Sequence, residues 1–286
     1  MIAIYEPIYL PGQTLSEPAF RPLTIENNNR AEWREFYIIV DMYRRGLHRE
    51  QRFTGLFSPK FELKTGVTGT RFIEFVHDNS GADVCFINAF AQLAYISFNV
   101  WMQGENAHPG LIARAQALLD ATGVELRIDD VPRHGPDLLC YCNFWAGTEQ
   151  FWDDYVGGVL IPIADYLDNN PDVPTVRAVL DQTMHTDPAP FLPFIIERLF
   201  SSHLSRPGNN IKPCVFPMDP IRACLNDFER DVVQFRRSEI DIADCAGQFS
   251  DALKSSMALV CRLRQTYTNL YYESRPHPHS GKPLCR

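Results

Sequence analysis

Short apolar runs of strand character alternate with segments of helical period, and this alternation restricts the chain to one fold class. Runs rich in β-branched or aromatic residues predict strands, whereas apolar positions spaced by three and four predict helices. The predicted strands are Ile2–Tyr5, Phe53–Phe61, Asp83–Ile87 and Leu138–Trp145. The predicted helices are Ala31–Arg45, Thr70–Val76, Leu111–Thr122, Glu149 to about Leu167 and Phe194–His203, with a loop over Asn169–Pro190. We therefore expect an α/β domain with a mostly parallel sheet flanked by helices.

The chain changes character after residue 206, so we assign the α/β domain to residues 1–206. Residues 207–217 predict a linker, and residues 218–274 predict a C-terminal helical extension with a break at Gly247. Residues 275–286 are expected to be disordered. The apolar stripe of the extension must be buried against the domain, a second copy or a partner. We expect a homodimer, because the acidic first half and the basic second half suit antiparallel pairing, and packing within the chain is the alternative.

Charge and hydropathy exclude several classes of protein. The chain has 27 basic and 35 acidic residues, and its net charge of -8 predicts no nucleic-acid partner. A few local cations for one diphosphate are still compatible with this charge. No run of about 18 apolar residues is present, which predicts no transmembrane segment. Eight scattered cysteines predict reduced, structural thiols in a protein that is cytoplasmic or peripheral at the inner membrane.

Familiar catalytic fingerprints are missing from the sequence. The chain contains no Gly-x-Gly-x-x-Gly, P-loop, Gly-x-Ser-x-Gly or His-Glu-x-x-His motif. Their absence disfavours dehydrogenases, P-loop kinases, α/β-hydrolases and zinc proteases. Asp-x-Asp, a pair that holds Mg²⁺ or Mn²⁺ on a diphosphate, is absent too, so a requirement for either metal stays open.

Ligands of open α/β sheets bind outside the carboxyl ends of the strands, which directs attention to four predicted loops. These loops follow Tyr5, Phe57, Asn88 and Cys142.

Three groups of polar residues are candidates for a site. Residues 99–108, with Gln103 and His108, are interpreted as a loop at the ligand-binding edge, and a surface loop with a capping role is the alternative. Asn143 follows a buried strand, where its amide could bond a sugar hydroxyl. Lys60 and Lys64 could neutralise a diphosphate, although solvated surface lysines are common. The aromatic residues after Asn143 could form a sugar platform or belong to the core.

Several segments, in order, resemble one protein family. The segments are Asn28-Asn29, Arg34–Ile39, Gly55–Lys60, Asp83–Ile87, Gln103–His108, Asn143–Gly147, Phe151–Tyr155, Ile161–Ile163 and Phe191–Phe200. Together they resemble the capsular and exopolysaccharide glycosyltransferase-like domain of bacterial polysaccharide clusters, long catalogued as a domain of unknown function. The resemblance covers about residues 1–204. The chain keeps Lys60 but lacks the His and the Arg pair of the family pattern, and Gly104 replaces a Tyr.

The resemblance implies a GT-A-like fold that transfers a hexosyl group from a nucleotide sugar to a glycan or lipid-linked glycan in surface polysaccharide biosynthesis. Gln103 and His108 would be catalytic at the donor–acceptor junction, with His108 as a base, a donor to the diphosphate or a metal ligand. Asn143 and Trp145 would contact the acceptor. The implied donor-binding residues are Tyr5, Asn28, Asn29, Glu35, Lys60, Asp83 and Asn88, and Glu197 and Arg198 match the closing Glu-Arg of the family.

Two other functions stay open. A catalytically lapsed sugar- or nucleotide-binding scaffold subunit, assembled through the helical extension, is favoured by the missing His and Arg pair after Leu56. The retained Gln103, His108 and Asn143 disfavour it. A generic α/β enzyme acting on nucleotides rests on fold analogy alone.

Overall fold

The computed structural model describes residues 1–26, 28–183 and 189–284. Its main sheet has six strands in the order β2-β1-β3-β5-β4-β8. These are β1 (Ile2–Ile8), β2 (Arg21–Thr24), β3 (Phe53–Leu56), β4 (Val84–Phe86), β5 (Trp145–Gly147) and β8 (Pro213–Val215). β1 is parallel to β2 and β3, and β4 is parallel to β8, whereas β5 runs antiparallel between β3 and β4. The expected α/β fold with a mostly parallel sheet is confirmed.

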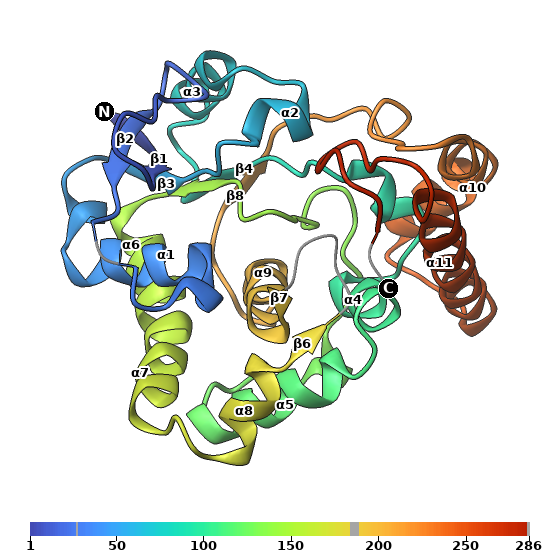
Figure 1. Ribbon diagram of the computed structural model, residues 1–286. Helices are drawn as coiled ribbons and strands as arrows, with labels where there is room; N and C mark the ends of the chain where they lie inside the picture. The colour runs from blue at the N-terminus through green and yellow to red at the C-terminus, as the bar shows by residue number, and fades with distance from the viewer. Residues whose placement is uncertain (27, 184–188, 285–286) are drawn as a thin grey trace.

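Helices cover both faces of this sheet (Figure 1). The helices up to residue 130 are η1 (Ala31–Trp33), α1 (Glu35–Arg44), η2 (Leu47–Arg49), α2 (Phe61–Thr65), α3 (Gly69–Asp78), η3 (Ala91–Tyr95), α4 (Val100–Ala107), α5 (Leu111–Thr122) and η4 (Ile128–Asp130). The later ones are α6 (Glu149–Phe151), the π-helical η5 (Trp152–Leu160), α7 (Ile161–Asn169), α8 (Pro174–Leu180), α9 (Phe191–Leu204), α10 (Asp227–Ala246) and α11 (Asp251–Tyr272). A second, two-stranded sheet pairs β6 (Gln182–Thr183) with β7 (Ala189–Pro190).

Successive residues of each strand pack into different cores, as the two-residue period of a strand requires. Ala3 and Tyr5 belong to the larger core, and Ile4 between them belongs to the smaller one. Helices α2 and α3 close the smaller core, whereas α1, η5 and α9 pack in the larger one on the other side of the sheet (Figure 1). The apolar sequences of β1, β3, β4 and β5 therefore follow from burial on both faces, whereas the edge strand β2 is mostly exposed.

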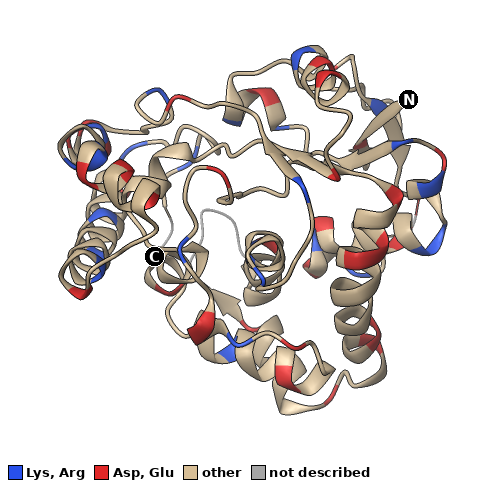
Figure 2. Cartoon of the chain, turned by 180° about the vertical axis from the view of Figure 1, so that it is seen from behind, with Lys and Arg blue, Asp and Glu red and all other residues tan. Residues whose placement is uncertain are grey.

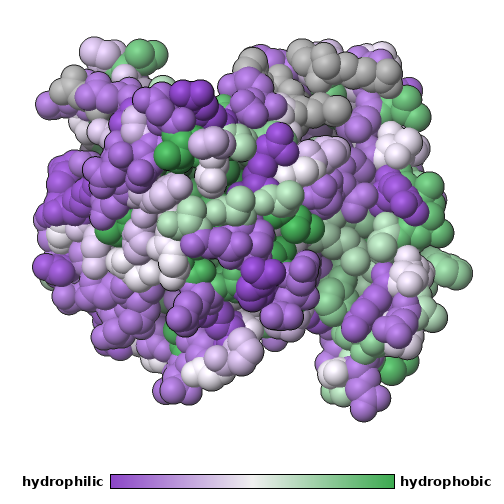
Figure 3. Space-filling model, turned by 90° about the horizontal axis from the view of Figure 1, so that it is seen from below, coloured by the Kyte–Doolittle hydropathy of each residue, from purple (hydrophilic) through white to green (hydrophobic). Residues whose placement is uncertain are grey.

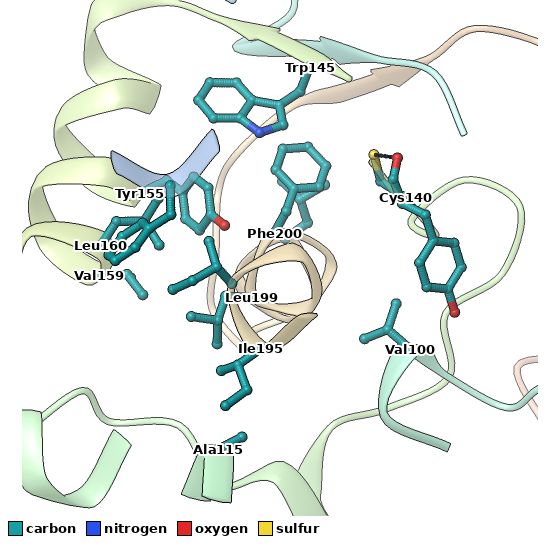
Figure 4. Close-up of a cluster of buried hydrophobic side chains, with 14 of the residues drawn as sticks. Val100, Ala115, Cys140, Trp145, Tyr155, Val159, Leu160, Ile195, Leu199 and Phe200 are labelled. Carbon is teal, nitrogen blue, oxygen red and sulfur yellow. Dashed lines mark hydrogen bonds between the residues drawn. The ribbon is translucent and has the colours of Figure 1, made fainter. Parts of the chain in front are cut away.

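Helix α9 lies at the centre of the larger core. Side chains from β5, α4, α5 and η5 surround it (Figure 4). The ring of Phe200 stacks on Trp145 with centroids 5.8 Å apart, and Trp145 is only 2% exposed. Trp145 is therefore a core residue and lies out of reach of an acceptor, contrary to its expected role. The neighbouring Phe151 and Trp152 are buried as well, so the core alternative holds for the aromatic platform.

Two sequence expectations around the site are wrong in their local structure. Residues 99–108 are a helix, because the Asn99 side chain accepts hydrogen bonds from the amides of Trp101 and Met102 and caps α4. Residues 138–144 are not a strand, because Cys142 and Asn143 have φ of 68° and 53°, which no sheet ladder accommodates.

Three other segments differ from expectation in their bounds. The strand expected over Phe53–Phe61 ends at Leu56, and residues 31–45 are broken at Arg34 between η1 and α1. The segment expected to be a loop up to Pro190 contains α8, which begins with proline at its first turn. By contrast, α5 ends at Gly123 as predicted, and the stretch from Glu149 is helical through η5 and α7.

The two long helices of the C-terminal extension are present, with Gly247 ending α10 at a φ of 61°. Their buried positions recur every three or four residues, including Val233, Ile240, Met257 and Cys261. This stripe packs within the chain, where α10 contacts η3 and α11 contacts α4. The linker expected over 207–217 instead contains β8, which extends the sheet beside β4 and ties the extension to the first domain.

The outer surface of the extension mixes charge with apolar residues. Figure 2 shows acidic and basic segments interspersed on these helices. Several large apolar side chains stay exposed there, among them Phe235 at 90% and Ile242 at 69%. Figure 3 shows hydrophobic atoms on the side of the molecule that α10 and α11 form. A homodimer through this surface stays a prediction.

Residues 275–284, expected to be disordered, form turns against the rest of the chain. The amide of Leu284 donates to the carbonyl of Tyr272, and the amide of His277 donates to that of Lys282. The His279 ring lies 5.3 Å from the ring of Phe90. Aromatic packing thus positions a segment whose composition alone suggested disorder. Residues 285 and 286 lie outside the described residues.

Candidate functional site

A pocket of about 580 Å³ lies at one edge of the main sheet. β1, β3 and β4 are parallel to one another, so their carboxyl ends meet at this edge, together with the amino end of β5. Residues 58–60 follow β3, Phe90 follows β4, and residues 141–143 precede β5, and all of them line the pocket. The pocket therefore occupies the position at which open α/β sheets bind ligands.

Cationic side chains are concentrated in this pocket, although the chain as a whole carries a net charge of -8. Five cationic side chains and two carboxylates line it: Arg34, Lys60, Lys64, Arg198 and Arg264 against Glu35 and Glu197. Part of this charge is neutralised locally, since Arg264 is paired with Glu229 behind it at 2.7 Å. Among these five cations Lys60 is the exposed one, and Lys64 is half-buried four residues further along the chain.

Lys64 lies in the middle of a polar cluster. Its Nζ donates to Cys142 Sγ at 3.2 Å, and the Cys142 amide donates to Glu197 Oε1 at 2.6 Å. Burial lowers the pKa of Lys64, but Cys142, Glu197 and Glu35 outweigh it, so the pKa is raised above its ordinary value. Burial raises the pKa of the Cys142 thiol to about 11, with Lys64 opposing that rise. At neutral pH the thiol is therefore protonated, and Lys64 is a charged ammonium held by the two glutamates.

Arg198 organises the floor of the pocket. Its side chain is 2% exposed, and it donates to the carbonyls of Val100 and Phe194 and to Gln103 Oε1, the last at 2.5 Å. Gly104 makes this possible, because a Cβ there would collide with Arg198 Nε and with Leu111. The glycine that departs from the family pattern thus has a packing reason. Gln103 is 9% exposed and bonded to Arg198, so it supports the site from below.

His108 ends helix α4 at the pocket wall. Its ring stacks on Phe194 with centroids 3.8 Å apart, and Nδ1 lies 3.3 Å from Thr183 Oγ1. The side chain lines the pocket but is 6% exposed. Two contacts hold the ring in one plane, which suits a group that positions or exchanges a proton.

Backbone strain is concentrated at the same place. Within the described residues, the non-glycine residues with positive φ are Arg34, Cys142 and Asn143, and all three line this pocket. Such conformations cost about 1–3 kcal/mol each and persist where the surrounding structure enforces them, most often at functional sites. This coincidence is independent of charge and of the sequence motifs, and it points to the same pocket.

The structure brings seven of the expected site residues together and separates the others. The seven that line the pocket are Glu35, Lys60, Gln103, His108, Asn143, Glu197 and Arg198. Asp83 is at the opposite, amino edge, where its carboxylate accepts from the Lys212 amide. Asn88 is 3% exposed and accepts from the Phe90 amide, so it shapes the turn after β4.

The expected nucleotide position near the first strand is not part of this pocket either. Tyr5 is 7% exposed and lines a different cavity between β1, β2 and α1. The Asn28 side chain accepts from the Arg30 amide and turns the chain toward η1, with Asn29 exposed beside it. Tyr9, just after β1, does line the pocket, whereas Tyr5, Asn28 and Asn29 do not.

Several pocket residues had no signal in the sequence. Tyr141, Arg264, Gln265, Thr268, Asn269 and His279 line the pocket together with the residues above. They come from an irregular segment and from helix α11 with the turns after it, far along the chain from β3 and β4. The packing of α11 on α4 places the α11 residues there, so no local pattern could have identified them.

Metal binding and membrane insertion find no support in the part of the chain that the structure describes. No three His, Cys, Asp or Glu side chains among the described residues are grouped to hold a metal ion. No helix among the described residues combines the length and apolar character needed to cross a bilayer. Dependence on Mg²⁺ or Mn²⁺ stays a prediction.

A cavity of about 660 Å³ lies elsewhere, between the end of α5, residues 123–132 and the end of α9. Its inner surface is mainly apolar, and it is far along the helices from the strand ends. Its lining includes Arg127 and Arg206, but it contains none of the strained residues and lies away from the carboxyl ends of the strands, so we assign the candidate site to the pocket at the sheet edge.

Comparison of the chain with protein-family models, with curated proteins and with solved structures found no match.

Proposed function

We propose that the protein is a glycosyltransferase that uses a nucleotide sugar as donor and a glycan as acceptor. The observation that carries the proposal is the gathering of Lys60 and Lys64 in a pocket at the carboxyl edge of the sheet, in a chain of opposite net charge. A diphosphate bound there would receive charge from both ammonium groups. The family resemblance, including the matched Lys60, Gln103 and His108, supports the same assignment.

The proposed reaction follows from these groups. An acceptor hydroxyl oxygen forms a bond to the anomeric carbon, and the bond from that carbon to the diphosphate oxygen breaks. The departing nucleoside diphosphate takes the electron pair, and Lys60 and Lys64 stabilise its developing charge. The acceptor proton passes to a base, for which His108 is the proposed residue, with Asn143 orienting a sugar hydroxyl.

A binding subunit without catalysis is the second candidate. One observation favours it: Gln103 Oε1 is occupied by Arg198, so this expected catalytic group is not directed at a substrate. In that case nucleotide sugars would bind to the same lysines without turnover.

Thermal denaturation with UDP-, GDP- and CDP-sugars, each with and without Mg²⁺ or Mn²⁺, tests the proposal. We expect one nucleotide class to raise the melting temperature. Lys60→Ala should remove this shift, whereas Lys212→Ala should keep it, because Lys212 precedes β8 at the opposite edge of the sheet. Release of nucleoside diphosphate on adding acceptor separates the transferase from the binding subunit. A melting temperature unchanged by every nucleotide sugar would contradict both candidates.

A further inference from the structure

Helix α11 and the turns after it form one wall of the pocket. Arg264, Gln265, Thr268 and Asn269 lie on one face of the helix and all line the pocket. The face is held in place, because Cys261 Sγ contacts the Met102 carbonyl oxygen of α4 at 4.0 Å. A polar helix face that is rigid and turned into a pocket is suited to ligand recognition.

Two amides on this face are oriented by each other. Gln265 Nε2 donates to Asn269 Oδ1 at 2.9 Å. The bond leaves Gln265 Oε1 as an acceptor and Asn269 Nδ2 as a donor for a ligand. One donor and one acceptor a helical turn apart match two neighbouring hydroxyls, since a hydroxyl both donates and accepts.

Arg264 adds further donors beside them. Its Nε donates to Glu229 Oε1 at 2.7 Å, and Glu229 also accepts from the Leu225 amide and from Gln92. The ion pair fixes the guanidinium plane and neutralises its charge. Because Nε makes the bond to Glu229, the two terminal nitrogens are further donors that suit uncharged oxygen acceptors such as sugar hydroxyls.

Two buried hydroxyl groups, one of them on this helix face, also line the pocket. Tyr141 is 3% exposed and Thr268 is 6% exposed, and neither hydroxyl has a hydrogen-bond partner among the residues that the structure describes. Burial raises the pKa of Tyr141, so its hydroxyl keeps its proton and can donate. An unpaired buried hydroxyl is unfavourable, and a polar ligand that displaces the surrounding side chains slightly would satisfy it. The ring of Phe90 nearby offers an apolar surface of the kind on which sugar rings pack.

We propose that this part of the pocket is the subsite for a sugar unit of the acceptor glycan. The inference rests on the proposed transferase function, which makes a second sugar-binding position necessary beside the donor. The lysines assigned to the donor come from the turn after β3 and from α2, whereas the sugar-binding groups come from α11. The C-terminal extension is therefore a substrate-binding element.

Saturation-transfer NMR on the full chain tests the subsite without a known acceptor. The probes are the methyl glycosides of glucose, galactose, mannose, N-acetylglucosamine and rhamnose. At least one should receive saturation from the protein. Gln265→Ala and Asn269→Ala should each weaken its binding about fivefold, as expected for one lost hydrogen bond. Gln150→Ala is the matched control, since Gln150 Nε2 donates to Asp154 at 2.9 Å in an exposed i, i+4 pair elsewhere.

Two results would overturn the subsite. Either none of the five glycosides binds, or one binds equally to the wild type and to both α11 variants. The nucleotide-sugar melting experiment is independent of these results, because it depends on Lys60 and not on α11. Sugar binding lost in the α11 variants with no nucleotide effect would support a glycan site and contradict the transferase. A nucleotide effect without sugar binding would contradict the subsite alone.

Discussion

Glu229→Ala should detach the C-terminal extension from the pocket and lower the free energy of unfolding by about 3–5 kcal/mol. The Glu229 side chain is fully buried, and its partner Arg264 is 8% exposed. Removing the carboxylate leaves a buried guanidinium without a counter-charge and leaves the Leu225 amide and Gln92 without an acceptor. At roughly 2 °C per kcal/mol for a chain of this size, the melting temperature should fall by roughly 6–10 °C.

Urea denaturation followed by circular dichroism measures this loss. Gln234→Ala, at an exposed position on the same helix, should stay within about 0.5 kcal/mol of the wild type. The double variant Glu229→Leu with Arg264→Met should recover most of the stability, because it removes both charges and keeps the volume. The reasoning fails if Glu229→Ala loses less than about 1 kcal/mol, or if the double variant is as unstable as the single one.

Three further predictions concern two residues at the floor of the pocket and one buried histidine. Gly104→Ala should lower the free energy of unfolding, measured by urea titration, by about 1–3 kcal/mol, because the added Cβ would collide with Arg198. Gly158→Ala is the control: its Cβ meets no close neighbour, so the free energy of unfolding should stay unchanged or rise slightly. Gln103→Ala should also lower the free energy of unfolding by about 1–3 kcal/mol, because the buried Arg198 guanidinium loses an acceptor. An unchanged melting temperature would contradict a structural role for Gln103. Burial and Arg206 lower the pKa of His203 to about 4, so the unfolded chain binds a proton near pH 6.5 that the folded chain excludes. The contribution of this histidine to the free energy of unfolding should therefore be complete above pH 6.5 and should fall by about 1.4 kcal/mol per pH unit as the pH drops toward 4. His203→Gln should make the pH dependence of the free energy of unfolding less steep.

Much of the secondary structure was readable because its signals are local. The apolar spacing of residues 111–122 and the glycine that follows specify α5 and its end, and the stripe after residue 226 specifies α10 and α11. Alternating burial on both faces explains why Ile2–Tyr5 and Asp83–Ile87 were recognised as strands. These patterns depend on the period of a helix or a strand, which a few neighbouring residues define.

The local structure of two segments that line the pocket was predicted wrongly. The stretch from Leu138 looked like a strand, but the Cys140 amide donates to Ser201 Oγ and the Cys142 amide to Glu197, so α9 takes the place of a neighbouring strand. Residues 99–108 were interpreted as a loop because polar groups are concentrated there, but Asn99 caps a helix, and Gly104 within that helix leaves room for Arg198. The side chains that decide the segment from Leu138 lie about 60 residues away, whereas the cap of α4 is local.

The sequence by itself determined the α/β class and part of the pocket lining, including Lys60, Gln103, His108 and Asn143. Only the tertiary structure decided that Asp83 faces the opposite edge and that Arg264, Gln265 and Asn269 complete the pocket. The reason is physical. The strand character of a segment is a local property. The edge of the sheet at which its residues lie depends on the pairing of β4 with β5 and β8. The position of α11 depends on its packing against α4.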